Sequence, residues 1–280
     1  MVLVLAGASR WVVTEVRPDA EPTLSSLAMG CGWAALVSLM LLRRGPARVS
    51  LRSSWLGVLA GAMVFAGPAV GALMHARGLD GPGLTMALAL TPVAAGIASA
   101  ALGMGSLDGA AGRIWPGLAA VGGLLLVLAE PSLANGRTDV ALLLAPVLTG
   151  VGAALFCVRG GATSWRASSA LLGGTLVFAV ALTVESVMTR TRPAVSLLAM
   201  ACDGLLALLS IYALQRLGAT RWSAQFTLLP LLVVLEGLVL AHQPLTLRWV
   251  VGIALLLLAS VYLLLPSTED MEQAVGVVPR

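Results

Sequence analysis

Long apolar stretches alternate with short polar, turn-forming clusters along the whole chain. Clusters such as Arg17-Pro18-Asp19, Gly81-Pro82-Gly83 and Gln243-Pro244 contain the residue types that favour turns and interrupt helices. A helix needs roughly 20 consecutive apolar residues to cross the hydrocarbon core of a bilayer. The pattern therefore predicts ten membrane-spanning helices, at about residues 2–16, 24–42, 55–75, 84–104, 114–130, 139–157, 169–188, 194–214, 222–241 and 247–265.

The same pattern occurs twice in the chain. In the first copy an apolar run that ends in Thr91-Pro92 follows Leu79, and in the second a run that ends in Leu229-Pro230 follows Leu217. Corresponding residues lie 138 positions apart (230 − 92). An internal repeat of this kind indicates that one architectural unit is used twice.

The repeat divides the predicted spans into two halves, residues 1–134 and 135–266, followed by a cytoplasmic tail at 267–280 that we expect to be disordered. Each half holds five spans, which is an odd number, so the second half would enter the membrane upside down relative to the first. Arginine is more frequent in the loops after the even-numbered spans, which predicts that both termini are cytoplasmic. The expected fold is an all-α polytopic membrane protein of ten helices in two inverted repeats, located in the plasma (cytoplasmic) membrane.

Composition supports lipid as the surroundings of these helices. The chain is 59% hydrophobic and 11% charged, with a mean hydropathy of +0.96, whereas soluble domains contain about 25% charged residues. The net charge of +4 does not come from a basic run interleaved with aromatic residues, so nucleic acid is not an expected partner. The sequence has no glycine-rich nucleotide loop with lysine and no cluster of metal ligands, so we expect neither ATP drive nor a cofactor.

The most specific motifs lie between residues 211 and 263, and a weaker echo covers 73–128. They are Tyr212-Ala213-Leu214, Leu217-Gly218-Ala219, Leu229-Pro230, Gln243-Pro244-Leu245-Thr246 and Gly252. With these motifs and ten predicted spans, the chain resembles the EamA-like, ten-helix branch of the drug/metabolite transporter superfamily. The resemblance implies that branch's fold and the transport of small solutes. The family usually has glutamate before the ninth-span proline and in the next loop, where this chain has Leu229 and Gln243.

An ionisable side chain in the middle of a membrane costs roughly 2.5–3.5 kcal/mol on insertion scales, so each one needs an explanation. Glu236 lies in the ninth predicted span, 11 residues after Gln225 and 7 before Gln243, so all three share one helix face. The corresponding residues of the fourth span are small. We expect spans four and nine to face each other across a cavity lined by Gln225 and Glu236. Alternatively, Glu236 lies near the helix end and reaches interfacial water.

Asp203 lies near the middle of the eighth predicted span. It belongs to a stripe of small and polar residues at helical spacing, formed by Ser196, Ala199, Asp203, Ala207 and Ser210. One interpretation is a face that lines a substrate pathway. The other is a packing surface at which small residues let helices approach closely, and the two are compatible.

Arg10 lies in the middle of the first predicted span and keeps its charge there. It would pair with Glu236 or Asp203, or contact an anionic group of the substrate, unless the first helix is offset and Arg10 lies near a membrane surface. Tyr212 is a further candidate lining residue. Tyr212 and Trp222 could instead belong to the aromatic belt at the membrane surface, which is the usual location for such side chains.

Together these features predict a secondary transporter, an exporter of a small polar metabolite or amino acid-like solute that works by alternating access. Glu236 and Asp203 are the candidates for exchanging a proton. The expected partners are the solute and the lipid bilayer. A homodimer is also compatible with the sequence, which does not decide the oligomeric state. The main alternative is a non-transporting membrane scaffold or subunit, which predicts no continuous polar cavity. An intramembrane transferase is less favoured, because no loop carries a clustered polar signature, and we expect no enzymatic activity.

Overall fold

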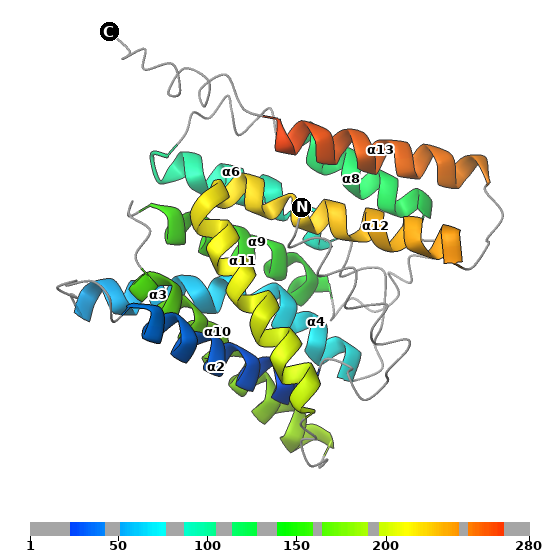
Figure 1. The fold of residues 1–280 in the computed structure, drawn as a ribbon. Coiled ribbons are helices and arrows are strands. Elements are labelled where there is room, and N and C mark those ends of the chain that lie inside the picture. Colours follow the sequence, from blue (N-terminus) through cyan, green and yellow to red (C-terminus); the bar gives the residue numbers. More distant parts are fainter. Residues whose placement is uncertain are drawn as a thin grey trace, which may run out of the picture.

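The structure is a computed structural model that describes residues 23–42, 51–76, 87–104, 114–127, 139–158, 164–189, 196–240 and 246–265. All regular secondary structure in these residues is helical (Figure 1). The helices are α2 (Leu24–Leu42), α3 (Leu51–Val64), α4 (Ala66–Ala76), α6 (Thr91–Ala101), α8 (Ile114–Val127), α9 (Asp139–Cys157), α10 (Ser164–Thr189), α11 (Leu197–Ser223), α12 (Gln225–Leu240) and α13 (Leu247–Leu264).

Some of these bounds agree with the predicted spans, whereas α11 ends nine residues after its predicted span of 194–214 and α10 begins five residues before its predicted span of 169–188. The helices α2 and α9 have the predicted limits, and α13 differs from its predicted span by one residue. The helix α6 is shorter than its predicted span of 84–104. The predicted span 2–16 and the tail 267–280 lie outside the described residues.

Several helices have the length and composition of membrane spans. Four helical segments of the described residues are long and apolar enough to cross a membrane: Ser54–Met74, Trp165–Val187, Leu197–Ser223 and Leu247–Leu264. Shorter apolar helices accompany them. The described part of the chain is thus an all-helical protein with the character of a membrane-embedded one.

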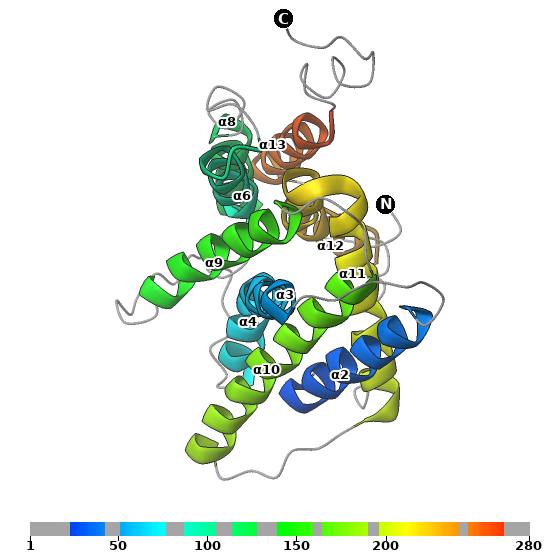
Figure 2. The same cartoon turned by 90° about the vertical axis from the view of Figure 1, so that its left-hand side faces the viewer.

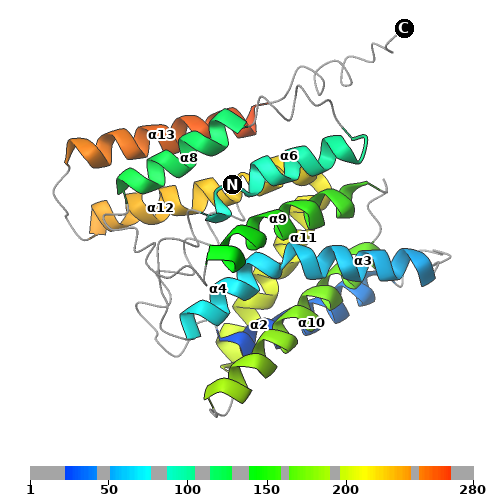
Figure 3. The ribbon, with the colours of Figure 1, turned by 180° about the vertical axis from the view of Figure 1, so that it is seen from behind.

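The predicted third span is divided into α3 and α4, which meet at Phe65 and run in different directions (Figure 3). Pro68 has no N–H to donate to the carbonyl of Val64, so the regular helical bonding is interrupted at this point. The N–H of Gly67, in the first turn of α4, donates to Thr149 Oγ1 of α9 at 3.1 Å. A side chain from a neighbouring helix therefore satisfies a backbone donor at the bend.

A second interruption lies inside α11. Gly218 has φ 77° and ψ 167°, a conformation that is open to glycine and strained for other residues. The chain continues through Ala219 to Ser223 and then enters α12. The sequence pattern predicts a break between 214 and 222, and Gly218 lies within that interval.

Glycine permits close approach at two helix contacts that matter below. A Cβ atom added to Gly30 of α2 would lie 2.7 Å from the backbone nitrogen of Gly204 on α11. A Cβ atom added to Gly123 of α8 would lie 2.8 Å from the carbonyl oxygen of Gly252 on α13. Contacts this close need small residues on both helices, as is usual where helices pack in lipid.

The buried side chains form two clusters. The larger cluster joins α2, α3, α4, α6, α9, α10 and α11, and the smaller one joins α8, α12 and α13. Figure 1 shows α11 crossing between the two groups, and Figure 2 shows α8 and α13 on the far side of α9 from α10. Within the larger group α2 packs against α10 and α11, and α3 packs against α10 and α9.

Candidate functional site

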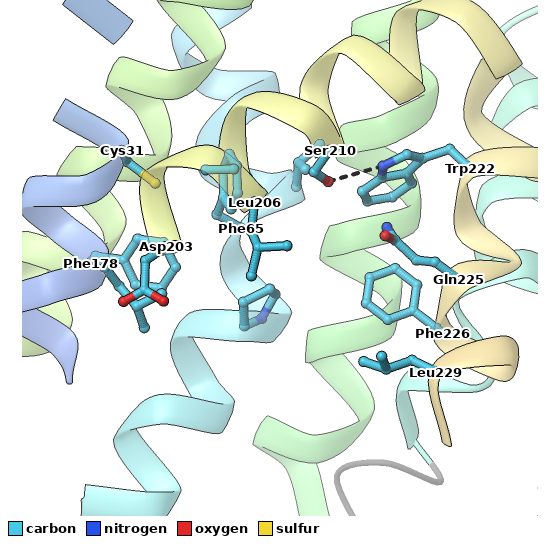
Figure 4. A pocket seen from close by; sticks show the side chains of 14 residues that line it. Cys31, Phe65, Phe178, Asp203, Leu206, Ser210, Trp222, Gln225, Phe226 and Leu229 are labelled. Atoms are coloured by element: carbon cyan, nitrogen blue, oxygen red, sulfur yellow. Dashed lines mark hydrogen bonds between the residues drawn. The ribbon is translucent and has the colours of Figure 1, made fainter. Parts of the chain in front are cut away.

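A cavity of about 210 Å³ lies where α2, α3, α4, α10, α11 and α12 converge (Figure 4). Its lining residues are Leu27, Cys31, Val64, Phe65, Pro68, Phe178, Asp203, Leu206, Ala207, Ser210, Trp222, Gln225, Phe226 and Leu229. Most of these side chains are apolar. Both interruptions described above border the cavity, because Phe65 and Pro68 come from the α3–α4 bend and Trp222 follows Gly218.

Asp203 supplies the charged group of this wall. Its side chain is 5% exposed, and its Oδ2 atom accepts a hydrogen bond from Ser26 Oγ at 2.6 Å. A short distance of this kind is typical of a hydroxyl bonded to a carboxylate. The close approach of Gly30 to Gly204, the residue after Asp203, brings the start of α2 within reach of this carboxyl group.

Ser26 also belongs to the N-terminal cap of α2. The N–H of Ser26 donates to Thr23 Oγ1 at 3.1 Å, and the N–H of Thr23 donates to Ser26 Oγ at 3.0 Å, which is a reciprocal capping arrangement. The Ser26 hydroxyl lies 2.9 Å from the Thr23 carbonyl oxygen and 2.6 Å from Asp203 Oδ2. A hydroxyl has one proton to donate, so it serves one of these two acceptors at a time.

The opposite side of the cavity is formed by residues at the α11–α12 junction. Trp222 is 3% exposed, and its Nε1 atom donates to Ser210 Oγ at 3.1 Å. Figure 4 shows Gln225 and Phe226 beside Trp222, across the cavity from Asp203 and Phe178. This side therefore presents an amide and an indole where the other side presents a carboxyl group.

Aromatic rings occur on both sides as pairs. The ring centroids of Phe65 and Phe178 are 5.9 Å apart, and those of Trp222 and Phe226 are 5.5 Å apart in an edge-to-face arrangement. Both separations lie in the range of favourable aromatic contacts. The chain has only four phenylalanines, and three of them line this cavity.

The structure brings together two of the residues predicted from sequence, Asp203 and Gln225. Tyr212 is half-buried against the larger core cluster and is not one of the lining residues. Arg10 lies outside the described residues, and Glu236 lies in α12 with its side chain outside them. The roles proposed for Arg10 and Glu236 therefore stay predictions.

The stripe of small and polar residues on α11 takes part in helix packing and in the cavity wall, and its role in a substrate pathway stays a prediction. Asp203, Ala207 and Ser210 line the cavity, whereas Ala199 is fully buried. Ser196 caps the helix by accepting from the N–H of Ala199 at 3.4 Å. One helix face thus combines helix packing with a cavity wall.

Two expectations about the surroundings of the site are wrong. Trp222 does not belong to a belt at the membrane surface, because its side chain is buried and lines the cavity. The described part of the fourth span does not face the ninth across this cavity, since none of the described lining residues comes from α6. The sequence pattern does not identify Phe65 and Phe178 as lining residues, because an apolar side chain in an apolar span gives no signal of which face meets the cavity.

Among the side chains that the structure describes, no group of histidine, cysteine, aspartate or glutamate is arranged to hold a metal ion. No protein-family model matches this chain, and a comparison with characterised proteins finds none that matches it.

Proposed function

We propose that this protein is a secondary transporter that carries a small organic solute across the plasma membrane by alternating access. The observation that carries the proposal is the cavity between five spans of a membrane-type protein, with the buried Asp203 carboxyl group in its wall. Burying a carboxyl group among apolar helices is costly, so such groups mark pathways for solutes, ions or protons.

The helix contacts support an inverted-repeat arrangement. In such a repeat each span corresponds to the span five later, so α2 corresponds to α10, α8 to α13, and the α3–α4 span to α11. The contact of α2 with α11 should then have a counterpart between α10 and α3, and both contacts occur. Inverted repeats of this kind are common in secondary transporters, which move one bundle against the other around a central site.

The interruptions around the cavity suit this motion. Pro68 and Pro230 each lack the N–H that would bond to the preceding turn, and Gly218 adopts a backbone conformation outside the helical region. Discontinuous helices next to a central cavity are a recurring feature of transporters, because they let parts of a span change direction while the rest stays packed. In this chain all three of these spans, α3–α4, α11 and α12, supply cavity residues.

Asp203 is the candidate for proton coupling whose side chain the structure describes. If Asp203 is ionised, the Ser26 hydroxyl donates to its Oδ2 atom; if Asp203 is protonated, it donates to Ser26 Oγ and the Ser26 hydroxyl turns to the Thr23 carbonyl. The same atoms accommodate both states without rearranging the backbone. Exchange of solute for a proton requires that binding and protonation compete for one site, and this arrangement provides one. Glu236, whose side chain lies outside the described residues, stays a candidate for the same role on the sequence argument.

A non-transporting scaffold is the alternative function. It would have no need for a carboxyl group in the wall of an internal cavity, so the position of Asp203 favours transport.

The test compares metabolites inside and outside cells that express the wild-type protein, Asp203→Asn or Glu185→Gln. Glu185 is a carboxylate on α10 that does not line the cavity, so its variant is the matched control. We expect at least one solute to be redistributed by the wild type and by Glu185→Gln, and not by Asp203→Asn. No redistribution by the wild type, at equal amounts of protein in the membrane, would contradict the proposal.

A further inference from the structure

We infer that the solute is a small carboxamide, whose C=O and N–H groups lie side by side, attached to a single apolar ring. This inference deepens the transport function proposed above by naming the substrate class, and it rests on that function. The observations that carry it are the Gln225 amide, the aromatic rings beside it and the size of the cavity. None of them depends on the charge of Asp203.

Gln225 presents its amide to the cavity. It is the first residue of α12, directly after the α11–α12 junction, and its side chain is half-buried. Figure 4 shows this side chain directed into the cavity, with Trp222 and Phe226 on either side of it. Among the residues that the structure describes, none forms a hydrogen bond with the amide. Its N–H groups and its carbonyl oxygen are therefore available to a solute.

The polar side chains of Trp222, Ser210 and Asp203 already have partners. The Trp222 N–H donates to Ser210 Oγ at 3.1 Å, and Asp203 Oδ2 accepts from Ser26 Oγ at 2.6 Å. A solute group that pairs with Gln225 leaves both of these bonds intact. Gln225 is thus the group in the wall that can offer hydrogen bonds without first breaking one.

The Gln225 amide selects for a matching amide. A glutamine side chain offers N–H donors and a carbonyl acceptor next to each other. A carboxamide can pair with both at once, in either orientation of the glutamine amide, because it can turn over. A carboxylate only accepts and an amidinium only donates, so each leaves part of Gln225 unpaired in a wall that is mostly apolar. Unpaired polar groups in such surroundings weaken binding.

The rings around the cavity favour a flat apolar body. Trp222 and Phe226 form an edge-to-face pair beside Gln225, and Phe65 and Phe178 form a second pair across the cavity (Figure 4). A ring placed between the two pairs would bury both of its faces against aromatic surface, which is a favourable contact. A solute with an amide at one end and a ring at the other therefore finds matching surroundings for both parts.

The size of the cavity limits the solute to one ring. Its volume of about 210 Å³ lies below the roughly 300–1,000 Å³ that is usual for pockets of drug-sized ligands. It exceeds the roughly 150 Å³ of an apolar cavity that holds benzene. A single ring with a small substituent suits this space, and a second ring system does not.

The test is calorimetric titration of the purified full-length protein in lipid nanodiscs with four probes of nearly the same shape: benzamide, benzoate, benzamidine and acetophenone. Benzamide is expected to bind at least about 5-fold more tightly than each of the other three, since leaving a buried polar group unpaired weakens binding by roughly 5-fold or more. Equal or tighter binding of any of the other three would overturn the inference. Absence of benzamide binding in the millimolar range would also overturn it.

A variant of Gln225 locates the binding. Gln225→Met keeps the length of the side chain but removes its donors and its acceptor. We expect it to weaken benzamide binding by about 10-fold and to reduce the advantage of benzamide over acetophenone to less than about 2-fold. The control is Gln215→Met, at a half-buried glutamine of α11 that does not line the cavity, and it should keep both the affinity and the ranking. An unchanged ranking in Gln225→Met would overturn the inference.

A pair of phenylalanine variants keeps the test decisive should Gln225→Met fail to fold, which thermal unfolding shows. Phe226→Leu, beside Gln225, should weaken benzamide binding by about 2- to 10-fold. Phe156→Leu, at a buried phenylalanine outside the cavity, should leave it unchanged. Equal affinities in these two variants would overturn the inference, as would a wild-type ranking in which benzamide is not first.

These measurements separate the inference from the function on which it rests. If benzamide binds through Gln225 but no carboxamide crosses vesicle membranes, the amide site stands and the transport function is wrong. If the protein transports a solute while benzamide does not bind, transport stands and the substrate class is wrong.

Discussion

The contact between α2 and α11 and the contact between α8 and α13 are both built on facing glycines, yet they differ in what surrounds them. Beside Gly30 and Gly204 lie Asp203, with its bond to Ser26, and the cavity. Beside Gly123 and Gly252 the neighbours are apolar side chains of the smaller cluster, such as Leu256. Close packing of small residues therefore does not identify a site by itself. The proposed function instead depends on the buried carboxyl group next to such packing, because a carboxyl group in an apolar span is costly.

Larger residues at these glycines should harm both regions but affect ligand binding in only one. Gly204→Val would place a side chain within 2.6 Å of the Gly30 carbonyl oxygen, and Gly123→Val would place one 2.8 Å from the Gly252 carbonyl oxygen. We expect each to lower the free energy of unfolding by about 3 kcal/mol, from overpacking. Thermal unfolding in nanodiscs measures this, and Gly122→Ala is the control, because no atom lies within 4 Å of its added Cβ.

Among the folded molecules of these two variants, the affinity for the transported solute should fall for Gly204→Val and stay unchanged for Gly123→Val. The reason is that only the first substitution moves α2 against α11 at the cavity wall. Equal losses of affinity in both would mean that the cavity depends on the whole bundle, and the contrast between the two contacts would then be wrong.

Ser26→Ala should show a smaller effect with a different signature. It removes the hydroxyl bonded to Asp203 Oδ2 and the acceptor of the Thr23 N–H. We expect the free energy of unfolding to fall by about 2 kcal/mol, because a hydrogen bond to a charged group contributes about 1.5–3 kcal/mol.

The pH dependence of solute flux should also change in Ser26→Ala. The variant lacks the hydroxyl that would change its hydrogen-bond partner when Asp203 gains or loses a proton. The control is Ser168→Ala, which removes a neutral hydrogen bond of 3.0 Å between α10 and the Ala35 carbonyl of α2. An unaltered pH profile in Ser26→Ala would show that this hydroxyl takes no part in coupling.

Trp222→Phe tests the side of the cavity opposite Asp203. The variant keeps an aromatic ring but loses the bond from Nε1 to Ser210 Oγ. We predict a loss of about 1 kcal/mol in the free energy of unfolding and, because the smaller ring offers less aromatic surface, an affinity for the transported solute that is weaker by about 5-fold. Titration calorimetry on the folded variant measures the second effect, and an affinity equal to that of the wild type would remove Trp222 from the site.

Ser260→Ala is expected to have the smallest effect. It removes the 3.2 Å bond between Ser260 of α13 and Thr227 Oγ1 of α12, while Thr227 keeps its own bond to the Ala224 carbonyl. We expect a loss of about 0.5–1 kcal/mol in the free energy of unfolding and no change in ligand affinity. A change in affinity would indicate that the smaller cluster is coupled to the cavity.

Hydropathy predicted the helices well because the lipid requirement acts on each span separately. The limits of α2 and α9 follow from apolar length alone. The candidate site was predicted in part: Asp203 stood out because a carboxyl group in an apolar span is rare, and Gln225 stood out by its register with Glu236.

The aromatic half of the site was not predictable in the same way. Phe65 and Phe178 lie on spans far apart in the sequence, and apolar residues in an apolar span give no signal of which face meets the cavity. The α3–α4 bend decides where Phe65 lies, and it depends on Thr149 of another helix as well as on Pro68. The mistaken placement of Trp222 has the same origin, since its burial depends on how the chain turns after Gly218.

Alternating access itself is tested most directly by the accessibility of one cavity position from both sides of the membrane. Leu206 lines the cavity and Leu256 is buried in the smaller cluster, so Leu206→Cys is the reporter and Leu256→Cys the control, in a variant without Cys31, Cys157 and Cys202. A membrane-impermeant thiol reagent is applied to right-side-out and to inside-out vesicles, and the rate of labelling is measured. A transporter that alternates predicts labelling of Leu206→Cys in both preparations and of Leu256→Cys in neither. Labelling of Leu206→Cys from one side only, or from neither, would contradict it.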